Sequence, residues 1–248
     1  MILIAGIAFV NYILLRLLGP RGMEITAFFG GLINSRKVIV EFMLRSAHNS
    51  EALAPVVFRG IMLATSAMAV RNAIILATIS HSREATYLSL APLGFMFLLS
   101  VALWRLNPVV KDELGVQHLE LDSPFSLSAA LKFGLVFLVL NIIGALAERR
   151  FGSSSFYFVS LAGGLLSSGS SIASTATLIR HGDIPTVVGV NGMVISSLTS
   201  VVINIPLVRR IGGTPALRRK ITISLIGITL AGLAGMAVSL SWSYFNFR

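Results

Sequence analysis

The chain has 248 residues, of which 55% are hydrophobic and only 12% are charged, and its mean hydropathy is +0.85. Soluble domains carry about 25% charged residues, so this chain cannot cover a water-facing surface and is predicted to be an integral membrane protein. The absence of cysteine excludes disulfides, thiolate metal sites and a cysteine nucleophile. The net charge of +10 is assigned to loop Lys and Arg residues that contact the lipid bilayer, and not to nucleic-acid binding.

A membrane-crossing helix needs about 20 predominantly apolar residues. On that criterion the sequence predicts an all-α, polytopic transmembrane bundle of eight spans without a cofactor. The apolar N-terminus has no charged n-region and no cleavage site, so it is expected to be a retained span and not a signal peptide. The predicted spans are residues 2–18, 25–45, 53–79, 86–104, 127–147, 155–179, 185–208 and 221–244.

A polar connector at residues 105–124 divides the chain into two predicted four-span halves, residues 1–104 and 125–248. The halves resemble each other. The pattern Arg-x-x-Gly…Gly-Gly of residues 16–31 recurs 133 residues later, and GIMLATSAMAVRN (60–72) aligns with GMVISSLTSVVIN (192–204) at an offset of 132. Because four spans is an even number, the two copies are expected to be parallel, with a binding site at their interface.

The Lys and Arg residues of the loops set the expected orientation. With the N-terminus outside, ten of them lie on the inner side and seven on the outer side. This orientation puts residues 209–220 inside, and it puts Arg105 and the interfacial Trp104 outside.

Residues 163–182, GGLLSSGSSIASTATLIRHG, concentrate small hydroxylated residues in an otherwise bulky apolar chain. They lack the lysine and the preceding strand of a phosphate-binding P-loop. As a helix, they have one small face, which favours either close helix packing or a polar wall along a substrate path. Both alternatives remain open. The face consists of Gly163, Ser167, Ser170, Ser171 and Ser174.

Other polar residues at membrane depth are candidates for a substrate path, because such residues are costly in lipid. Lys37, Glu41 and Arg45 have an i, i+4 spacing that lets opposite charges pair. At the offset of 133, Lys37 aligns with Ser170 and Glu41 with Ser174, so this charged ladder is expected to face the small face. The further candidates are Asn34, Asn72 and Asn204 and the intramembrane bases Arg36 and Arg71.

Several of these residues also have a purely structural explanation. Arg71 can extend its guanidinium to the headgroups. Asn72 and Asn204 can form interhelical hydrogen bonds. Pro206 is expected to interrupt its span and free backbone carbonyls.

Enzyme chemistry is not expected. The sequence has no G-x-S-x-G elbow, and Glu41, the clear carboxylate at membrane depth, has cationic neighbours. The histidines lie in or beside loops without the spacing of metal ligands, so the metal-binding residues are unknown. These histidines are His48, His81, His118 and His181.

Four separate motifs resemble the MgtC/SapB-associated membrane domain of unknown function 4010. They are FFGGLINS (28–35), RGIMLATSAMAVRNAIIL (59–76), SPFSLSAALKFG (123–134) and LAGGLLSSGSSIASTATL (161–178). The resemblance implies a multi-pass protein of the cell (inner) membrane, linked to Mg²⁺ homeostasis through the MgtC name, without established catalytic or metal residues. In that family an MgtC-like half usually precedes the domain and is absent here, so the expected partner is a separate MgtC-like protein or a second copy. The family's first Gly-Gly motif often continues with Ser and Thr, whereas this chain has Asn34-Ser35-Arg36-Lys37, which disfavours a shared cation site there.

The leading expectation is transport or permeation of an ion or small solute through the interface of the two copies. A positive interior favours an anion or a neutral solute, whereas the family name favours Mg²⁺. The alternative is a regulatory or scaffold membrane subunit that moves nothing. That alternative predicts a small-residue patch on the outside of the last span, at Gly232 and Gly235.

Overall fold

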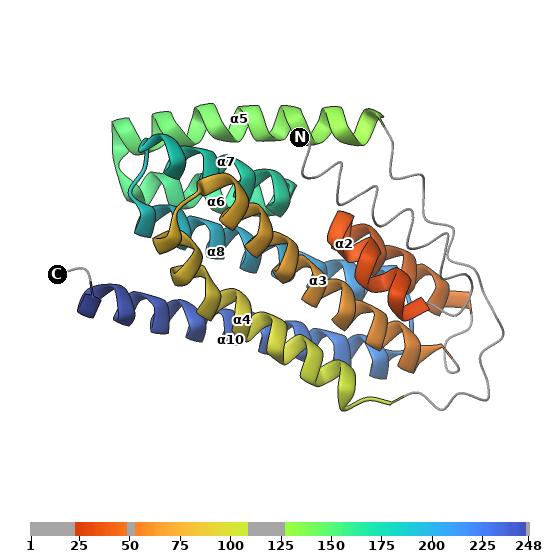
Figure 1. The fold of residues 1–248 in the computed structure, drawn as a ribbon. Helices are drawn as coiled ribbons and strands as arrows, with labels where there is room; N and C mark the ends of the chain where they lie inside the picture. The colour runs from red at the N-terminus through yellow and green to blue at the C-terminus, as the bar shows by residue number, and fades with distance from the viewer. Residues whose placement is uncertain (1–22, 49–52, 109–126, 247–248) are drawn as a thin grey trace. The chain divides into compact units, whose positions relative to one another are not determined.

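The structure is a computed structural model that describes residues 23–48, 53–108 and 127–246. The described residues form helices joined by short turns, and they contain no strand (Figure 1). The helices are α2 (Met23–His48), α3 (Ala54–Ser80), α4 (Arg83–Arg105), α5 (Leu127–Phe151), α6 (Ser153–Leu166), α7 (Ser168–His181), α8 (Thr186–Val202), α9 (Asn204–Ile211) and α10 (Pro215–Asn246).

Five stretches of these helices are long and apolar enough to cross a membrane. They match five of the eight predicted spans, so the protein is a multi-pass membrane protein. The predicted span 2–18 and residues 109–124 of the connector lie outside the described residues. The five stretches are Ala54–Ser80, Arg83–Arg105, Leu131–Phe151, Thr186–Ile211 and Pro215–Trp242.

The chain divides into two compact units, and α3, α4 and α10 each contribute to both. Unit 1 contains residues 1–68, 97–126 and 203–228. Unit 2 contains residues 69–96, 127–202 and 229–248. The units do not coincide with the predicted halves, because each one draws segments from both.

One predicted span is interrupted in unit 2. The sequence predicts a single span over residues 155–179, and this is wrong: α6 and α7 are separate helices of 14 residues each. Ser167, between them, has extended backbone angles (φ −163°, ψ 106°). Its hydroxyl accepts a hydrogen bond from the Ser170 N–H at 3.3 Å. Ser167 is therefore the N-cap of a new helix.

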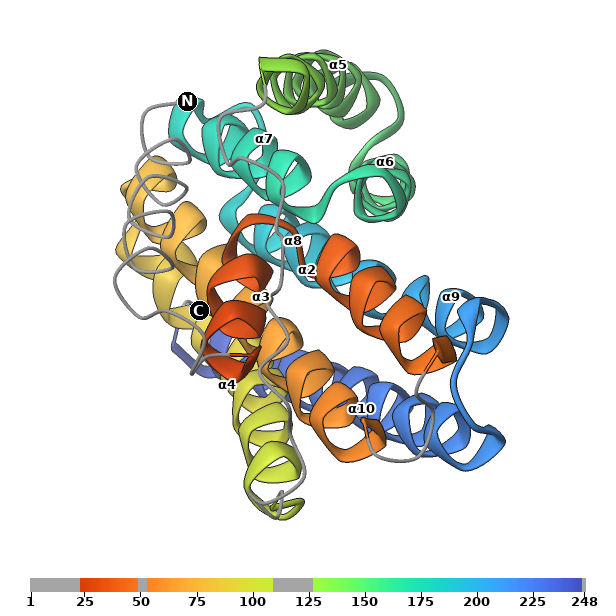
Figure 2. The ribbon, with the colours of Figure 1, turned by 90° about the vertical axis from the view of Figure 1, so that its right-hand side faces the viewer.

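The two short helices turn back on each other. Ser155 Oγ, at the start of α6, donates to Ala147 O near the end of α5 at 2.7 Å. An ion pair joins Arg149, also near the end of α5, to Asp183, just beyond α7. Both outer ends of the α6–α7 pair thus lie beside the same end of α5, and Figure 2 shows the two helices separately beneath α5. The pair is therefore a helical hairpin and not one continuous helix.

In unit 1, α2 is interrupted in the same way at Asn34 (φ −154°, ψ 92°). The Asn34 side chain caps the second half, because its Oδ1 accepts a hydrogen bond from the Lys37 N–H at 3.2 Å. The predicted span 25–45 is therefore helical but not continuous.

The relation between α4 and α10 corrects the expected orientation. In unit 1, Lys220 Nζ, near the start of α10, donates to Asn107 Oδ1, just beyond α4. In unit 2, Ser239 Oγ, late in α10, donates to Leu88 O, early in α4, at 2.8 Å. The two helices are therefore antiparallel. Eight complete crossings would make them parallel, with residues 105 and 220 on opposite sides. The α6–α7 hairpin accounts for the difference, because it returns the chain to the same end of α5.

Candidate functional site

Arg71 lies in the part of α3 that belongs to unit 2, and only 8% of it is exposed. Its Nη2 donates to Ser168 Oγ on α7 at 2.9 Å. Its Nε and Nη2 also donate to Asn72 Oδ1, at 3.2 and 3.1 Å. The guanidinium is therefore held inside the unit. The snorkelling explanation requires it to extend to the surface, so that explanation does not apply to Arg71.

Asn72 connects this guanidinium to α8. While its Oδ1 accepts from Arg71, its Nδ2 donates to Ser197 Oγ at 3.0 Å. The Ser197 hydroxyl in turn donates to Met193 O within α8 at 2.9 Å. The interhelical hydrogen bond predicted for Asn72 is thus confirmed, and α3 remains a continuous helix at this residue. Side-chain bonds between membrane helices contribute about 0.6–2 kcal/mol each.

The first turn of α7 lies against Arg71. A Cβ atom added to Gly169 would be 3.6 Å from Arg71 Cζ, an ordinary van der Waals distance, so the backbone of this turn lies beside the guanidinium. Helix N-termini carry a partial positive charge and unpaired N–H groups, which attract anions. A buried cation and a helix N-terminus therefore meet at this point, together with the hydroxyls of Ser167 and Ser168.

The remaining serines of the small face of α7 are used for packing. Ser170, Ser171 and Ser174 are all less than 5% exposed. The Ser170 hydroxyl donates to Phe133 O on α5 at 3.4 Å. A Cβ added to Gly163 would lie 2.5 Å from Ser171 Oγ, so α6 and α7 approach closely there. Of the two alternatives for this face, helix packing describes these three serines.

The charged ladder lies in unit 1. Arg45 Nε and Glu41 Oε1 form an ion pair at 2.9 Å, as the spacing predicts. Lys37 is exposed, and Arg36 is half-buried. Because the ladder belongs to unit 1 and α7 to unit 2, the expected pairing of the ladder with the small face stays a prediction.

Asn204 also belongs to unit 1. It begins α9, directly after an interruption at Ile203, and α9 packs against α2. Pro206 lies in the first turn of α9, where a missing N–H is tolerated. Asn204 is 2% exposed, and its Oδ1 has no hydrogen-bond partner.

Three features recur at corresponding positions of the two halves. The helix breaks at Asn34 and Ser167 are 133 residues apart. Close backbone approaches also correspond: a Cβ on Gly31 would lie 2.6 Å from Ala64 Cα, and a Cβ on Gly164 would lie 2.9 Å from Ser196 Cα. Finally, the contact between Glu24 and Arg59 in unit 1 corresponds to the contact between Tyr157 and Asn191 in unit 2.

A family model described as "Domain of unknown function (DUF4010)" matches residues 2–212. The chain belongs to this family. Both helix breaks and every residue of the Arg71 site lie within the DUF4010 match, whereas all of α10 lies beyond it. No curated protein matches the chain, and no solved structure matches it.

Sequence reasoning about this DUF4010 chain singled out Arg71, Asn72 and Ser167 but missed Ser168 and Ser197. The missed serines lie on α7 and α8, far from α3 in the sequence. Only the helix break beside Ser168 had a signal in the sequence: each half places a good N-cap residue, asparagine or serine, at the same position of an apolar run.

Proposed function

We propose that this DUF4010 protein transports a small anion across the membrane, and that the anion binds at the first turn of α7 beside Arg71. One observation carries the proposal: the guanidinium of Arg71 is buried and lies against the N-terminus of a half-helix. Ionisable residues inside membrane proteins mark substrate pathways. Interrupted helices whose N-termini face anionic groups are a recurring feature of transporter binding sites.

We further propose that the two halves are copies that run in opposite directions across the membrane. The corresponding helix breaks and glycine contacts support this duplication. The proposal extends the α6–α7 hairpin to the corresponding break in α2, which gives each copy an odd number of crossings and makes successive copies inverted. The antiparallel pair α4 and α10 supports that reading. Arg71 and Asn72 would then belong to one copy, and Ser168 and Ser197 to the other, with the site at their interface.

An anion agrees better with these residues than Mg²⁺ does. A protein Mg²⁺ site uses carboxylates, carbonyls and waters. Within the described ranges, no group of three His, Asp or Glu side chains could hold a metal ion. The hydroxyl and N–H groups beside Arg71 are instead suited to the oxygens of an oxyanion or to a halide.

The scaffold alternative loses its specific prediction. Gly232 and Gly235 are buried within unit 2. A Cβ on Gly232 would lie 2.6 Å from a side-chain carbon of Leu198, and a Cβ on Gly235 would lie 2.5 Å from Pro92 Cα. These glycines therefore serve internal packing and do not form an outer patch.

The test is solute flux into proteoliposomes that contain the purified protein. Chloride, nitrate, phosphate and Mg²⁺ are compared, because the proposal expects uptake of at least one of the anions and none of Mg²⁺. Ser168→Ala should lower the apparent affinity for the transported anion by about three- to tenfold, since one neutral hydrogen bond contributes about 1 kcal/mol.

The matched control is Arg150→Gln, which removes an exposed base of the same unit away from α7's first turn. It should leave the flux unchanged. Uptake of Mg²⁺ without any anion would overturn the proposal. The absence of all flux from folded protein would favour the non-transporting alternative.

A further inference from the structure

Six basic side chains gather at one end of unit 1, in a cluster that we call the basic end. Five of them are exposed, and Arg218 is half-buried. Contacts tie the contributing segments together: Lys220 Nζ donates to Asn107 Oδ1, and Arg218 Nη1 donates to Arg209 O at 3.0 Å. The cluster consists of Arg105, Arg209, Arg210, Arg218, Arg219 and Lys220.

The turn that presents most of these bases, between α9 and α10, is well ordered by its own residues. Thr214 is the N-cap of α10, because its Oγ1 accepts a hydrogen bond from the Leu217 N–H at 3.2 Å. Pro215 follows at the first helical position, where its fixed φ is favourable. Gly213 has a φ of 81°, a conformation that favours glycine. The bases are therefore held in place and do not belong to a flexible tail.

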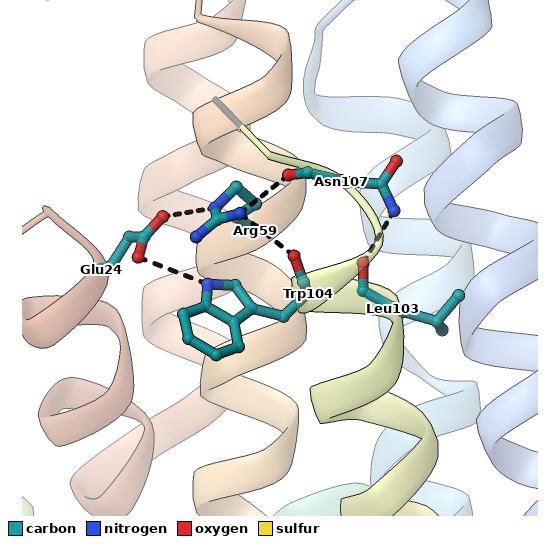
Figure 3. Close-up of polar contacts among 5 residues, drawn as sticks. All are labelled: Glu24, Arg59, Leu103, Trp104 and Asn107. Atoms are coloured by element: carbon teal, nitrogen blue, oxygen red, sulfur yellow. Dashed lines mark hydrogen bonds and ion pairs between the residues drawn. The ribbon is translucent and has the colours of Figure 1, made fainter. Parts of the chain in front are cut away.

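Within the described part of unit 1, no carboxylate pairs with any of the six bases. Glu24 is committed elsewhere: it forms an ion pair with Arg59 and accepts a 3.3 Å hydrogen bond from Trp104 Nε1, as Figure 3 shows. Glu41 pairs with Arg45. The positive charge of the basic end is thus not compensated by the acidic side chains described in this unit.

The position of three bases on α10 makes this charge more unfavourable. Arg218, Arg219 and Lys220 stand near the N-terminus of α10, and bases there oppose the helix dipole. In addition, the Nε of Arg218 is buried and has no hydrogen-bond partner among the described residues. A bound anion would relieve both conditions.

We propose that the basic end binds the headgroups of anionic phospholipids. The position of the cluster at the ends of membrane-crossing helices favours lipid over a soluble polyanion. Its bases flank the ends of two helices that are long enough to cross a membrane, α4 and α10. Trp104, an amphipathic residue typical of the membrane interface, lies directly before Arg105. The cytoplasmic leaflet carries the anionic lipids, so the basic end faces the cytoplasm.

This inference does not depend on anion transport, because the basic end and the Arg71 site lie in different units. Its test is the thermal unfolding midpoint of the full chain in detergent with added phosphatidylglycerol or phosphatidylcholine. Phosphatidylglycerol should raise the midpoint more, and salt should reduce the difference. In the variant Arg209→Gln/Arg210→Gln, the apparent affinity for phosphatidylglycerol should fall about tenfold or more, since each base contributes about a factor of five.

Two further variants make the result specific. Arg150→Gln/Arg180→Gln removes two exposed bases of unit 2 and should keep the full response. Arg209→Lys/Arg210→Lys retains the charge and should respond like the unchanged protein. This variant keeps the test decisive if the glutamine variant fails to fold. Equal effects of the two lipids, an equal loss in the unit 2 control, or the same shift with inorganic phosphate alone would each overturn the proposal.

Discussion

Arg71 and Ser168 are 97 residues apart in the sequence, yet a hydrogen bond of 2.9 Å from Arg71 Nη2 to Ser168 Oγ joins them. The bond connects α3, the most buried of the five long apolar stretches, with the first turn of α7. Ser168 directly follows the break at Ser167, where α6 ends and α7 begins.

The first prediction concerns the stability that this bond provides. Arg71→Met should lower the free energy of unfolding by about 1–3 kcal/mol, because Ser168 Oγ and Asn72 Oδ1 lose a buried donor. Arg71→Lys should lower the free energy of unfolding by less than Arg71→Met does, because an ammonium still donates hydrogen bonds but cannot reproduce the fork of the guanidinium. Unfolding in detergent measures the effect, and exposed Arg150→Met is the control. A loss for Arg150→Met as large as that for Arg71→Met would contradict a specific role for Arg71.

Hydropathy was sufficient to predict which segments of the chain are apolar helices. The five long stretches in the structure all correspond to predicted spans, because apolar length is a property of local sequence. Hydropathy could not show the break at Ser167. Leu165, Leu166 and Ile172 keep the average apolar across it, and only a capping side chain distinguishes the break from a helix interior.

The error at Ser167 then changed the predicted direction of every later span. Residues 209–220 were assigned to the side opposite Arg105, whereas Lys220 contacts Asn107. At the site, single-residue chemistry identified Arg71 and Asn72 as costly in lipid. Their partners Ser168 and Ser197 are neutral and common, so sequence offers no reason to choose them before the tertiary contacts are known.

The second prediction tests the two corresponding glycine contacts. Gly31→Ala and Gly164→Ala should each destabilise the protein by about 1–3 kcal/mol, because the added Cβ would meet the backbone of Ala64 or Ser196 at less than 3 Å. Gly94→Ala is the matched control within a helix, since nothing lies within 4 Å of its added Cβ. Tolerance of both test substitutions, measured by thermal unfolding in detergent, would argue against close helix packing at these sites.

The third prediction concerns the cluster in Figure 3. Arg59 pairs with Glu24, and its Nη1 donates to Trp104 O at 3.1 Å and Asn107 O at 2.9 Å. Because Arg59 keeps the two carbonyl partners, Glu24→Gln should cost only about 1 kcal/mol. Arg59→Gln should cost more. A double-mutant cycle of Glu24→Gln and Arg59→Gln should give a nonzero coupling energy, and strict additivity would contradict the pairing.

The fourth prediction follows from the α6–α7 hairpin. The chain contains no cysteine, so single cysteines can be labelled without background. Phe151→Cys and His181→Cys stand at exposed positions just before and at the end of the hairpin. A membrane-impermeant maleimide should modify both from the same side of the membrane. Labelling from opposite sides would mean that residues 155–179 cross the membrane completely, which would contradict the hairpin.

The last prediction tests the antiparallel pair α4 and α10 by the same method. Leu106→Cys and Ala216→Cys are exposed positions beside the contact between Asn107 and Lys220. Because these segments touch within unit 1, both cysteines should react from one side, and the surrounding bases place that side in the cytoplasm. Spheroplasts and inside-out vesicles distinguish the two faces. Eight complete crossings require one cysteine on each face, so labelling of the two cysteines from opposite faces would contradict the antiparallel arrangement. Labelling of both from the external face would contradict the cytoplasmic assignment of the basic end.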